Sequence, residues 1–204
     1  MKKIIGLKKF WYKGGQIKEI AYTLNGKRNG ECVKFSEDGT MTASCAYKNG
    51  QICGTLKEFY EDSSKELGYK NGKRHGPQFE YENGKIEKKY NCKNGNLHGE
   101  YIIYNDKERP KLVCNLVDGL LDGQLTSFDE KGKIKTLYNY KNDKKHGQCV
   151  KYQDNVCVIG HFCKGNPIKK WKEVDGRGKV IREFINSKLL GKAIFDNNKW
   201  NISL

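Results

Sequence analysis

Proline, methionine and long apolar runs are scarce in this sequence. It has 3 prolines and 2 methionines, and 36% of its 204 residues are hydrophobic, below the usual share of roughly 45–50%, a figure that counts glycine. No stretch approaches the ~20 apolar residues of a membrane-spanning helix. The first apolar run, Ile4 to Leu7, is shorter than the roughly 7–15 residues that a signal peptide needs. We therefore expect no transmembrane segment and a cytoplasmic location.

The eight cysteines lack the spacing of a zinc or disulfide framework, because no Cys-x-x-Cys occurs. Cysteines such as Cys45 and Cys92 are expected to be small buried hydrophobic residues, and unpaired thiols fit a reducing compartment. One local exception stays open: alternation places Cys157, His161 and Cys163 on one side of a strand, where they could hold a metal if a fourth ligand came from elsewhere. We expect no metal site and no cofactor.

Glycine, in contrast, recurs in a regular pattern. Pairs four positions apart return every 22 to 24 residues, and the series continues with one or both glycines replaced. The complete pairs are Gly26/Gly30, Gly50/Gly54, Gly72/Gly76, Gly95/Gly99 and Gly119/Gly123, and the degraded ones are Asp143/Gly147, Gly165/Lys169 and Ser187/Gly191. A fixed period of this size indicates a tandem repeat of about eight units.

Each unit predicts two strands. An aromatic residue follows the second glycine by five positions in six units, namely Phe35, Phe59, Tyr81, Tyr104, Phe128 and Tyr152. The third and fifth positions share one face of a strand, because side chains alternate with period two. Turn residues such as Asp38-Gly39 and Asn83-Gly84 follow.

The second strand of each unit is marked five and three residues before the next first glycine. These pairs are Cys45 and Tyr47, Leu67 and Tyr69, Tyr90 and Cys92, Cys114 and Leu116, and Tyr138 and Tyr140; Phe162 holds the later position in its unit. The first unit is interpreted as slipped by one residue, with Tyr22 four positions before Gly26. The predicted unit is strand, tight turn, strand and glycine-bracketed loop, and the predicted fold class is all-β.

The segment Asn71-Gly72-Lys73-Arg74-His75-Gly76-Pro77-Gln78-Phe79-Glu80-Tyr81-Glu82-Asn83-Gly84-Lys85 resembles a MORN repeat, specifically the bacterial variant of antitoxin-annotated repeat proteins. The resemblance covers roughly residues 14–196 and implies an elongated, twisted antiparallel sheet of successive hairpins. It also implies scaffolding, protein interaction or lipid association, although the repeat alone fixes none of these roles. We expect one domain, 1–204, with residues 1–13 and 197–204 as atypical ends around the repeats.

Histidine occurs mainly at one repeat position. His75, His98 and His146 directly precede the second glycine of their units, where Asn29 and Asp122 stand in others. A catalytic group would be needed once, so a recurring residue favours loop packing or hydrogen bonding. No nucleophile–histidine–carboxylate arrangement and no phosphate-binding glycine loop was found, and we expect no enzymatic activity.

The net charge of +15 is concentrated at the two ends. Residues 1–30 carry eight Lys and Arg against one acidic residue, residues 161–204 carry ten against four, and the middle carries 21 against 19. The candidate basic ends are Lys8, Lys9, Lys13, Lys169, Lys170 and Lys172. Trp11 and Trp171 lie among these lysines, as an open nucleic-acid surface would require. The alternatives are an acidic protein partner, anionic lipid, nucleic acid, or lysines that keep a sheet soluble.

The resulting hypothesis is a non-enzymatic protein-interaction scaffold. Its candidate partner-binding residues share one repeat position: Tyr47, Tyr69, Tyr140 and Phe162. The partner could be another protein or a second copy of the chain. Two alternatives stay open, namely an antitoxin-like neutraliser of a protein partner, suggested by the resemblance, and peripheral binding to anionic membranes through the basic ends.

Overall fold

The computed structural model describes residues 5–185, which form sixteen β-strands and no helix. The all-β prediction of tandem hairpins is therefore confirmed. Contacts divide the chain into two compact units, Met1–His98 and Gly99–Leu204. Within residues 5–185 there is no helix long and apolar enough to cross a membrane.

The strands are short and evenly spaced along the chain. The first eight are β1 (Ile5–Trp11), β2 (Ile17–Leu24), β3 (Lys27–Phe35), β4 (Met41–Lys48), β5 (Gln51–Phe59), β6 (Ser63–Lys70), β7 (Lys73–Glu82) and β8 (Lys85–Lys93). The others are β9 (Asn96–Tyr104), β10 (Pro110–Val117), β11 (Leu120–Phe128), β12 (Ile134–Lys141), β13 (Lys144–Gln153), β14 (Val156–Cys163), β15 (Asn166–Asp175) and β16 (Val180–Ile185).

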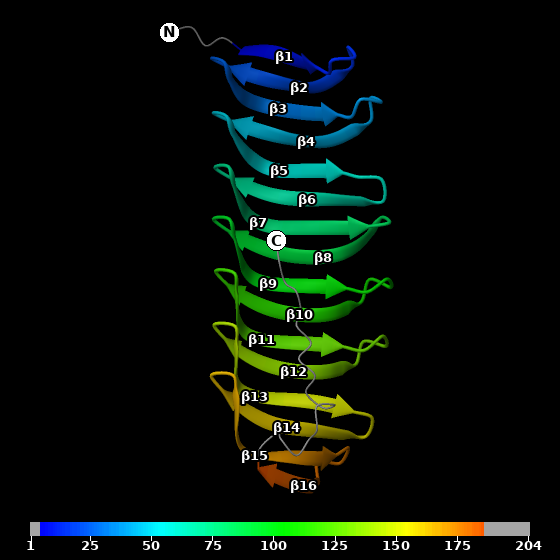
Figure 1. Ribbon diagram of the computed structural model, residues 1–204, viewed down its shortest axis with the longest axis vertical. Coiled ribbons are helices and arrows are strands. Elements are labelled where there is room, and N and C mark those ends of the chain that lie inside the picture. Colours follow the sequence, from blue (N-terminus) through cyan, green and yellow to red (C-terminus); the bar gives the residue numbers. More distant parts are fainter. Residues whose placement is uncertain (1–4, 186–204) are drawn as a thin grey trace. The chain divides into compact units, whose positions relative to one another are not determined.

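In each unit, every strand pairs antiparallel with the strand that follows it in the chain. The first unit runs from β1 to β8 in this way, and the second continues from β9 to β16. The turns that hold the first position of each glycine pair lie along one side of each unit, and the other connections lie along the opposite side (Figure 1). Two of these other connections, Asn83-Gly84 and Asp154-Asn155, are also two residues long. Each unit is thus a meander of hairpins.

The first glycine of each pair belongs to a two-residue turn. Asn25 and Gly26 have φ of 49° and 79°, and Asn49 and Gly50 have 53° and 84°. Positive φ at both central residues is the requirement of the type I′ hairpin turn, which Asn-Gly meets best. Successive turns are also tied together, since the Gly50 amide donates to the Arg28 carbonyl oxygen at 2.8 Å.

The second glycine lies inside a strand, which corrects the predicted glycine-bracketed loop. Gly30 belongs to β3 with φ of 111°, and the pairing register of β2 with β3 shifts opposite it, between Ala21 and Thr23. A Cβ at Gly30 would also lie 3.0 Å from the Tyr22 Cβ. The chain is already extended between the two glycines, because β3 begins at Lys27. A bulge bends its strand, so the bend lies at the second glycine.

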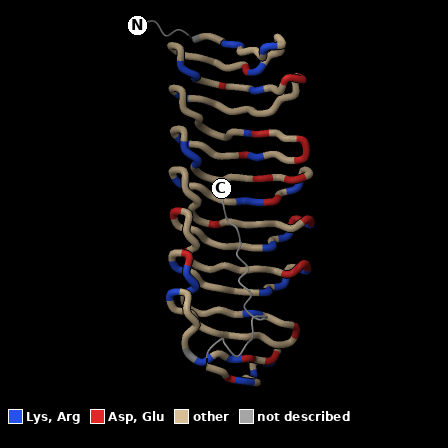
Figure 2. Tube along the Cα trace, viewed as in Figure 1, with Lys and Arg blue, Asp and Glu red and all other residues tan. Residues whose placement is uncertain are grey.

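The loops on the other side are built on a side-chain oxygen. In the Asp129–Lys133 loop, Asp129 Oδ1 accepts hydrogen bonds from the amides of Lys131 and Lys133 at 2.9 and 2.8 Å. Asn105 Oδ1 does the same for Lys107 and Arg109. Acidic and basic residues also occur together at these loops (Figure 2).

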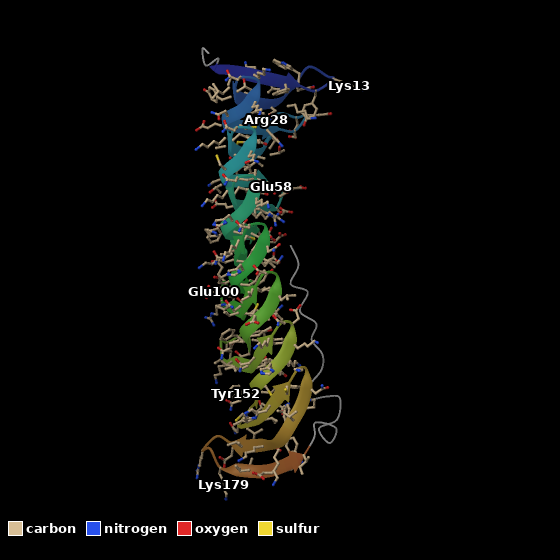
Figure 3. All side chains as sticks on the ribbon, turned by 90° about the vertical axis from the view of Figure 1, so that its left-hand side faces the viewer. Lys13, Arg28, Glu58, Glu100, Tyr152 and Lys179 are labelled. Atoms are coloured by element: carbon tan, nitrogen blue, oxygen red, sulfur yellow. The ribbon has the colours of Figure 1, made fainter. Side chains whose placement is uncertain are left out.

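The two faces of the sheet differ in burial, and side chains project from both (Figure 3). The side chain two positions after the second glycine is buried in five repeats and half-buried at Leu56, and it faces the residue five positions before the next first glycine. Leu67 faces Leu56, Tyr90 faces Gln78 and Tyr138 faces Leu125. We call this side the first face. The aromatic residues five positions after the second glycine, such as Tyr104 and Tyr152, lie on the second face.

The first repeat, which contains Gly26 and Gly30, also follows this rule, so its predicted one-residue slip is wrong. Ala21 and Thr23 are buried on the first face, five and three residues before Gly26. Tyr22 lies on the second face and is exposed. The predicted slip depends on treating Tyr22 as a buried-face residue, and Tyr22 lies on the exposed face.

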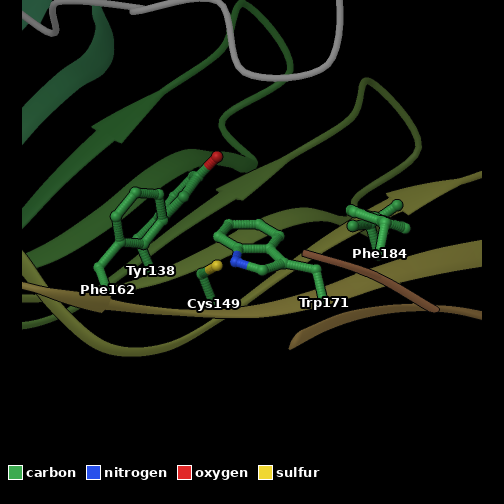
Figure 4. Close-up of a cluster of buried hydrophobic side chains, with 6 residues drawn as sticks. Tyr138, Cys149, Phe162, Trp171 and Phe184 are labelled. Atoms are coloured by element: carbon green, nitrogen blue, oxygen red, sulfur yellow. The ribbon is translucent and has the colours of Figure 1, made fainter. Parts of the chain in front are cut away.

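A cluster of buried hydrophobic side chains lies in the second unit, on the first face. It consists of Tyr138, Cys149, Val158, Phe162, Trp171 and Phe184. Trp171 is 0% exposed, and its ring meets Phe162 edge-on at 5.3 Å between centroids. Phe162 and Tyr138 lie on one side of the indole and Phe184 on the other (Figure 4).

The ends of the repeat region extend the hairpin pattern. Residues 5–11, placed by prediction in the N-terminal cap, form strand β1 and pair with β2. Lys169 of β15 stands where other repeats have the second glycine. The Ser187/Gly191 unit and the C-terminal cap 197–204 lie outside the described residues, and the division into one domain with two caps stays a prediction.

Candidate partner-binding surface

The four candidate residues each lie opposite a second glycine on the neighbouring strand. Tyr47 faces Gly30 and Tyr69 faces Gly54 in the first unit. In the second unit, the facing pairs are Tyr140 with Gly123 and Phe162 with Gly147. Because glycine has no side chain, one flank of each ring has no cross-strand neighbour at its own level.

The four residues differ in the surface that they expose. Tyr47, Tyr69 and Tyr140 are half-buried. Phe162 is only 8% exposed and packs between Tyr138 and Trp171. It therefore belongs to the hydrophobic cluster and offers a partner little area, whereas the three tyrosines keep accessible ring surface.

A cation accompanies the first of these tyrosines. The Arg28 guanidinium lies 5.6 Å from the ring centroid of Tyr47 and 5.5 Å from that of Phe10. It also donates two hydrogen bonds to the Glu19 carboxylate, at 2.7 and 3.0 Å. Burial alone would raise the pKa of Glu19, but the hydrogen bonds and charge of Arg28 outweigh it and lower that pKa. The charge of Arg28 is thus already balanced by Glu19.

Two further cations occupy the same repeat position, two residues after the first position of the pair. Arg74 is the cross-strand partner of Tyr69, and Lys145 that of Tyr140. The Lys145 ammonium lies 4.3 Å from the ring centroid of Tyr138, and burial lowers its pKa. No carboxylate of residues 5–185 forms an ion pair with Arg74 or Lys145.

The repeat pattern predicts the tyrosines but not the cations beside them. The signal was available, since Arg28, Arg74 and Lys145 share one repeat position. It was weak because Ile52, Leu97 and Leu121 fill that position in other units. Only the pairing register shows that Arg74 and Lys145 lie across from Tyr69 and Tyr140. Arg28 lies across from Thr23, and only the ring distance shows that it contacts Tyr47.

The candidate basic ends are partly neutralised. Lys8, Lys9 and Lys13 are exposed at the edge of the first unit. Lys170 and Lys172 both lie beside the Glu183 carboxylate, at 3.6 and 3.5 Å, and the side chain of Lys169 is outside the described part. The C-terminal group therefore carries less free charge than its sequence suggests.

The tryptophans at these ends also differ. Trp11 is 56% exposed, whereas Trp171 is fully buried in the hydrophobic cluster. The expectation that Trp171 is interleaved with lysines on an open surface is therefore wrong. Strand alternation turned this indole to the first face, and its ring fills a space left by Gly160.

Two non-histidine side chains at the histidine position bind a neighbouring turn. Asn29 Oδ1 accepts a hydrogen bond from the Asn49 amide at 3.1 Å, and Asp122 Oδ2 accepts one from the Asn142 amide at 3.3 Å. At His75, by contrast, the buried Nδ1 has no hydrogen-bond partner among the described residues. The hydrogen-bonding or packing role expected of the histidines themselves therefore stays a prediction.

The cysteines are free thiols in the structure. Cys32, Cys92, Cys114 and Cys149 are buried, which confirms the prediction of small buried side chains at these positions, whereas Cys45 is only half-buried. Cys157, His161 and Cys163 lie at alternating positions of β14. Within residues 5–185, no three His, Cys, Asp or Glu side chains are grouped so that they could hold a metal ion.

Comparison with known proteins gives no family. No protein-family profile matches the chain, and no curated protein is similar to it in sequence. Among solved structures, it is similar to a mutant of S. aureus TarM in complex with Fondaparinux, alpha-GlcNAc-glycerol and UDP. The two chains are 13% identical over 69% of this chain and 21% of that one, so this chain spans about a fifth of its length. The TM-score is 0.28, too low for an argument about function.

Proposed function

We propose that this protein is a non-enzymatic protein-interaction scaffold of the MORN-repeat type. The observation that carries the proposal is the recurrence of a half-buried tyrosine beside a cation: Tyr47 with Arg28, Tyr69 with Arg74 and Tyr140 with Lys145. Tyrosine and arginine are enriched in protein interfaces and dominate their binding energy. A surface that presents such a tyrosine and cation at three places suits an extended protein partner.

Two positively charged side chains without a carboxylate partner indicate what kind of partner the surface would bind. Arg74 and Lys145 have no carboxylate partner among the described residues, so a partner that supplies carboxylates would complete both pairs. An ion pair in a partly desolvated interface is stronger than one in water. We therefore propose an acidic protein partner. The free thiols favour a reducing compartment, and we assign the protein to the cytoplasm.

The test is affinity capture from native cells at low and at high salt, with the Tyr69→Ser/Tyr140→Ser variant beside the wild type. We expect one protein partner to be retained by the wild type and lost from the variant. Tyr22→Ser/Tyr60→Ser is the matched control, because both tyrosines are exposed and lie outside the tyrosine–cation pairs. Far-UV circular dichroism checks that both variants keep their β content.

Two outcomes would overturn the proposal. A partner that binds the Tyr69→Ser/Tyr140→Ser variant as tightly as the wild type would not use this surface. Retention of nucleic acid or anionic lipid alone, lost as salt rises, would assign the binding to the basic ends instead.

A further inference from the structure

A groove on the second unit carries the clearest unassigned surface. It has a volume of about 2020 Å³ and follows the side where β9, β11 and β13 end. Tyr104, Phe128 and Tyr152 line it, each five positions after the second position of its glycine pair. Tyr104 and Phe128 are half-buried, and Tyr152 is 44% exposed. Three accessible rings thus stand in one row, one hairpin apart.

The spacing of the rings selects the conformation of a ligand. Neighbouring strands lie about 4.7–4.9 Å apart, so equivalent residues two strands apart are separated by roughly 9.5 Å. A polyproline II helix has three residues per turn and a rise of 3.1 Å, so every third residue returns to one side after about 9.3 Å. The two spacings agree within a few tenths of an ångström.

Other conformations fit this row poorly. In an extended strand, side chains on one side recur every two residues, or about 6.6 Å, and an α-helix repeats every 5.4 Å. A ligand strand also needs an open sheet edge. Four of the strands that border the groove, β10, β11, β12 and β13, each pair on both sides and so offer none. A polyproline II segment has no such need, since its recognition relies on aromatic grooves.

The charge around the rings favours acidic residues in the ligand. The groove is lined by five exposed lysines: Lys107, Lys111, Lys131, Lys133 and Lys135. Four carboxylates also line it, those of Asp106, Asp129, Glu130 and Asp154. One of them, Asp129, is already bonded to two amides of its own loop. None of the five lysines lies within 4 Å of a described carboxylate. Backbone hydrogen bonds, with the nearby charges of Lys131 and Lys133, lower the pKa of Asp129, so Lys107, Lys111 and Lys135 are the lysines left for a ligand carboxylate.

We infer that this groove binds a proline-rich, acidic segment of a protein partner in the polyproline II conformation. A proline at every third position packs against Tyr104, Phe128 and Tyr152, and the acidic residues lie beside the lysines. The inference rests on the proposed interaction function and adds a second site, on the face opposite to the tyrosine–cation pairs.

The probe is a fluorescent peptide of three Pro-Pro-Glu triplets, titrated with the full-length protein and followed by anisotropy. We expect saturable binding that weakens with salt. A peptide of three Pro-Pro-Lys triplets tests charge, and one of three Thr-Val-Glu triplets tests conformation. Both should bind at least about tenfold more weakly, which corresponds to roughly 1.4 kcal/mol.

Matched variants locate the site. Tyr152→Ser should weaken the Pro-Pro-Glu peptide about tenfold, because ring stacking and packing carry much of such an interface. Lys111→Glu/Lys135→Glu should weaken it and reduce its salt dependence. Tyr81→Ser is the control, since Tyr81 holds the same repeat position in the first unit.

Three results would overturn the inference: no saturable binding at millimolar protein, equal binding of the Thr-Val-Glu peptide, or equal binding by Tyr152→Ser. If the peptide fails while partner capture still depends on Tyr69 and Tyr140, only this inference falls. If capture fails as well, the proposed function falls with it.

Discussion

Gly160 leaves the space that the Trp171 side chain fills. Gly160 is the cross-strand partner of Cys149, at the repeat position that Leu67 and Tyr138 occupy in other units. A Cβ built on Gly160 would lie 2.2 Å from ring carbons Cδ2 and Cε3 of Trp171. The cluster therefore takes its large side chain from β15 instead of β14, and the absence of a side chain at Gly160 is part of its packing.

Replacing Gly160 should therefore destabilise the second unit. We expect Gly160→Ala to lower the free energy of unfolding by about 1–3 kcal/mol, the usual cost of overpacking a well-packed core. The measurement is the urea midpoint at constant slope. Gly176→Ala is the control, because its Cβ would meet only the Asn155 carbonyl oxygen at an ordinary 3.5 Å. Trp171→Phe should recover part of the loss when combined with Gly160→Ala, and a midpoint unchanged in Gly160→Ala would contradict this account.

The repeat pattern predicts the architecture of the units well. Hairpin turns need positive φ, and Asn-Gly supplies it, so the period of the glycine pairs places every strand in the complete units. The pattern fails where a side chain is exchanged between strands. Gly160 interrupts the row of large first-face side chains on β14, and Trp171 of the next strand, β15, fills the space. The alternation of side chains within one strand cannot predict such an exchange.

The candidate surface was predicted in part for a similar reason. Tyr47, Tyr69 and Tyr140 share a sequence position that can be read directly. Which face they lie on depends on the bulge opposite the second glycine, because a shift of one residue reverses the faces of a strand. The cations beside them, and the burial of Phe162 and Trp171, follow from cross-strand neighbours and could not be read from one strand.

A residue with unfavourable backbone geometry gives the second prediction. Glu108 has φ of 54° in the Asn105–Arg109 loop, where the equivalent Gly132 has φ of 83°. The left-handed region costs a non-glycine residue about 1–2 kcal/mol, and glycine loses about 0.5–1 kcal/mol more chain entropy on folding. We expect Glu108→Gly to raise the free energy of unfolding by up to about 1 kcal/mol.

The reverse change in the matched loop should have the opposite sign. Gly132→Ala places a Cβ in open space, so only the backbone conformation opposes it. Thermal unfolding of both variants beside the wild type measures the two effects. A lower melting temperature for Glu108→Gly would show that contacts of the glutamate outweigh the strain of its backbone.

The Glu19–Arg28 pair gives a prediction about acid stability. Glu19 is 7% exposed, and the hydrogen bonds from Arg28 lower its pKa below the ordinary 4.5 despite burial. A lowered pKa in the folded state contributes stability above the unfolded pKa, which is lost as pH falls through the folded value. Glu19→Gln should therefore reduce the dependence of unfolding free energy on pH below about 4.5.

Replacing Arg28 should lower the free energy of unfolding more than neutralising Glu19 does. Arg28→Met leaves the Glu19 carboxylate without its partner, at a cost of about 1–3 kcal/mol at pH 7. Part of the pair is open to water, since 40% of the Arg28 side chain is exposed, so we expect the lower half of that range. Lys57→Met is the control, because an ion pair as exposed as Lys57–Glu66 should contribute little to stability. Equal losses in the two variants would show that burial of Glu19 has no effect.

The buried thiols give a prediction at alkaline pH. Burial raises the pKa of Cys114 from 9.0 to about 12, and burial together with the nearby Glu19 carboxylate raises that of Cys32 to about 12. Thiol reagents attack the thiolate, so both residues should stay unmodified by iodoacetamide at pH 8 in the native protein and react in denaturant. Peptide mass spectrometry of the labelled chain measures this, with half-buried Cys53 as the internal reference.

The same shift makes the folded state lose stability as pH rises. A raised folded pKa contributes stability that is complete below the unfolded value and lost as pH increases through the folded value, here between about 9 and about 12 for Cys114. Cys114→Val removes the ionisable group and keeps an apolar side chain, so its unfolding free energy should fall less steeply with pH over this window. Cys163→Val, at a half-buried position, is the matched control. If Cys114→Val and the wild type lose stability in parallel up to pH 12, then folding does not raise the pKa of Cys114.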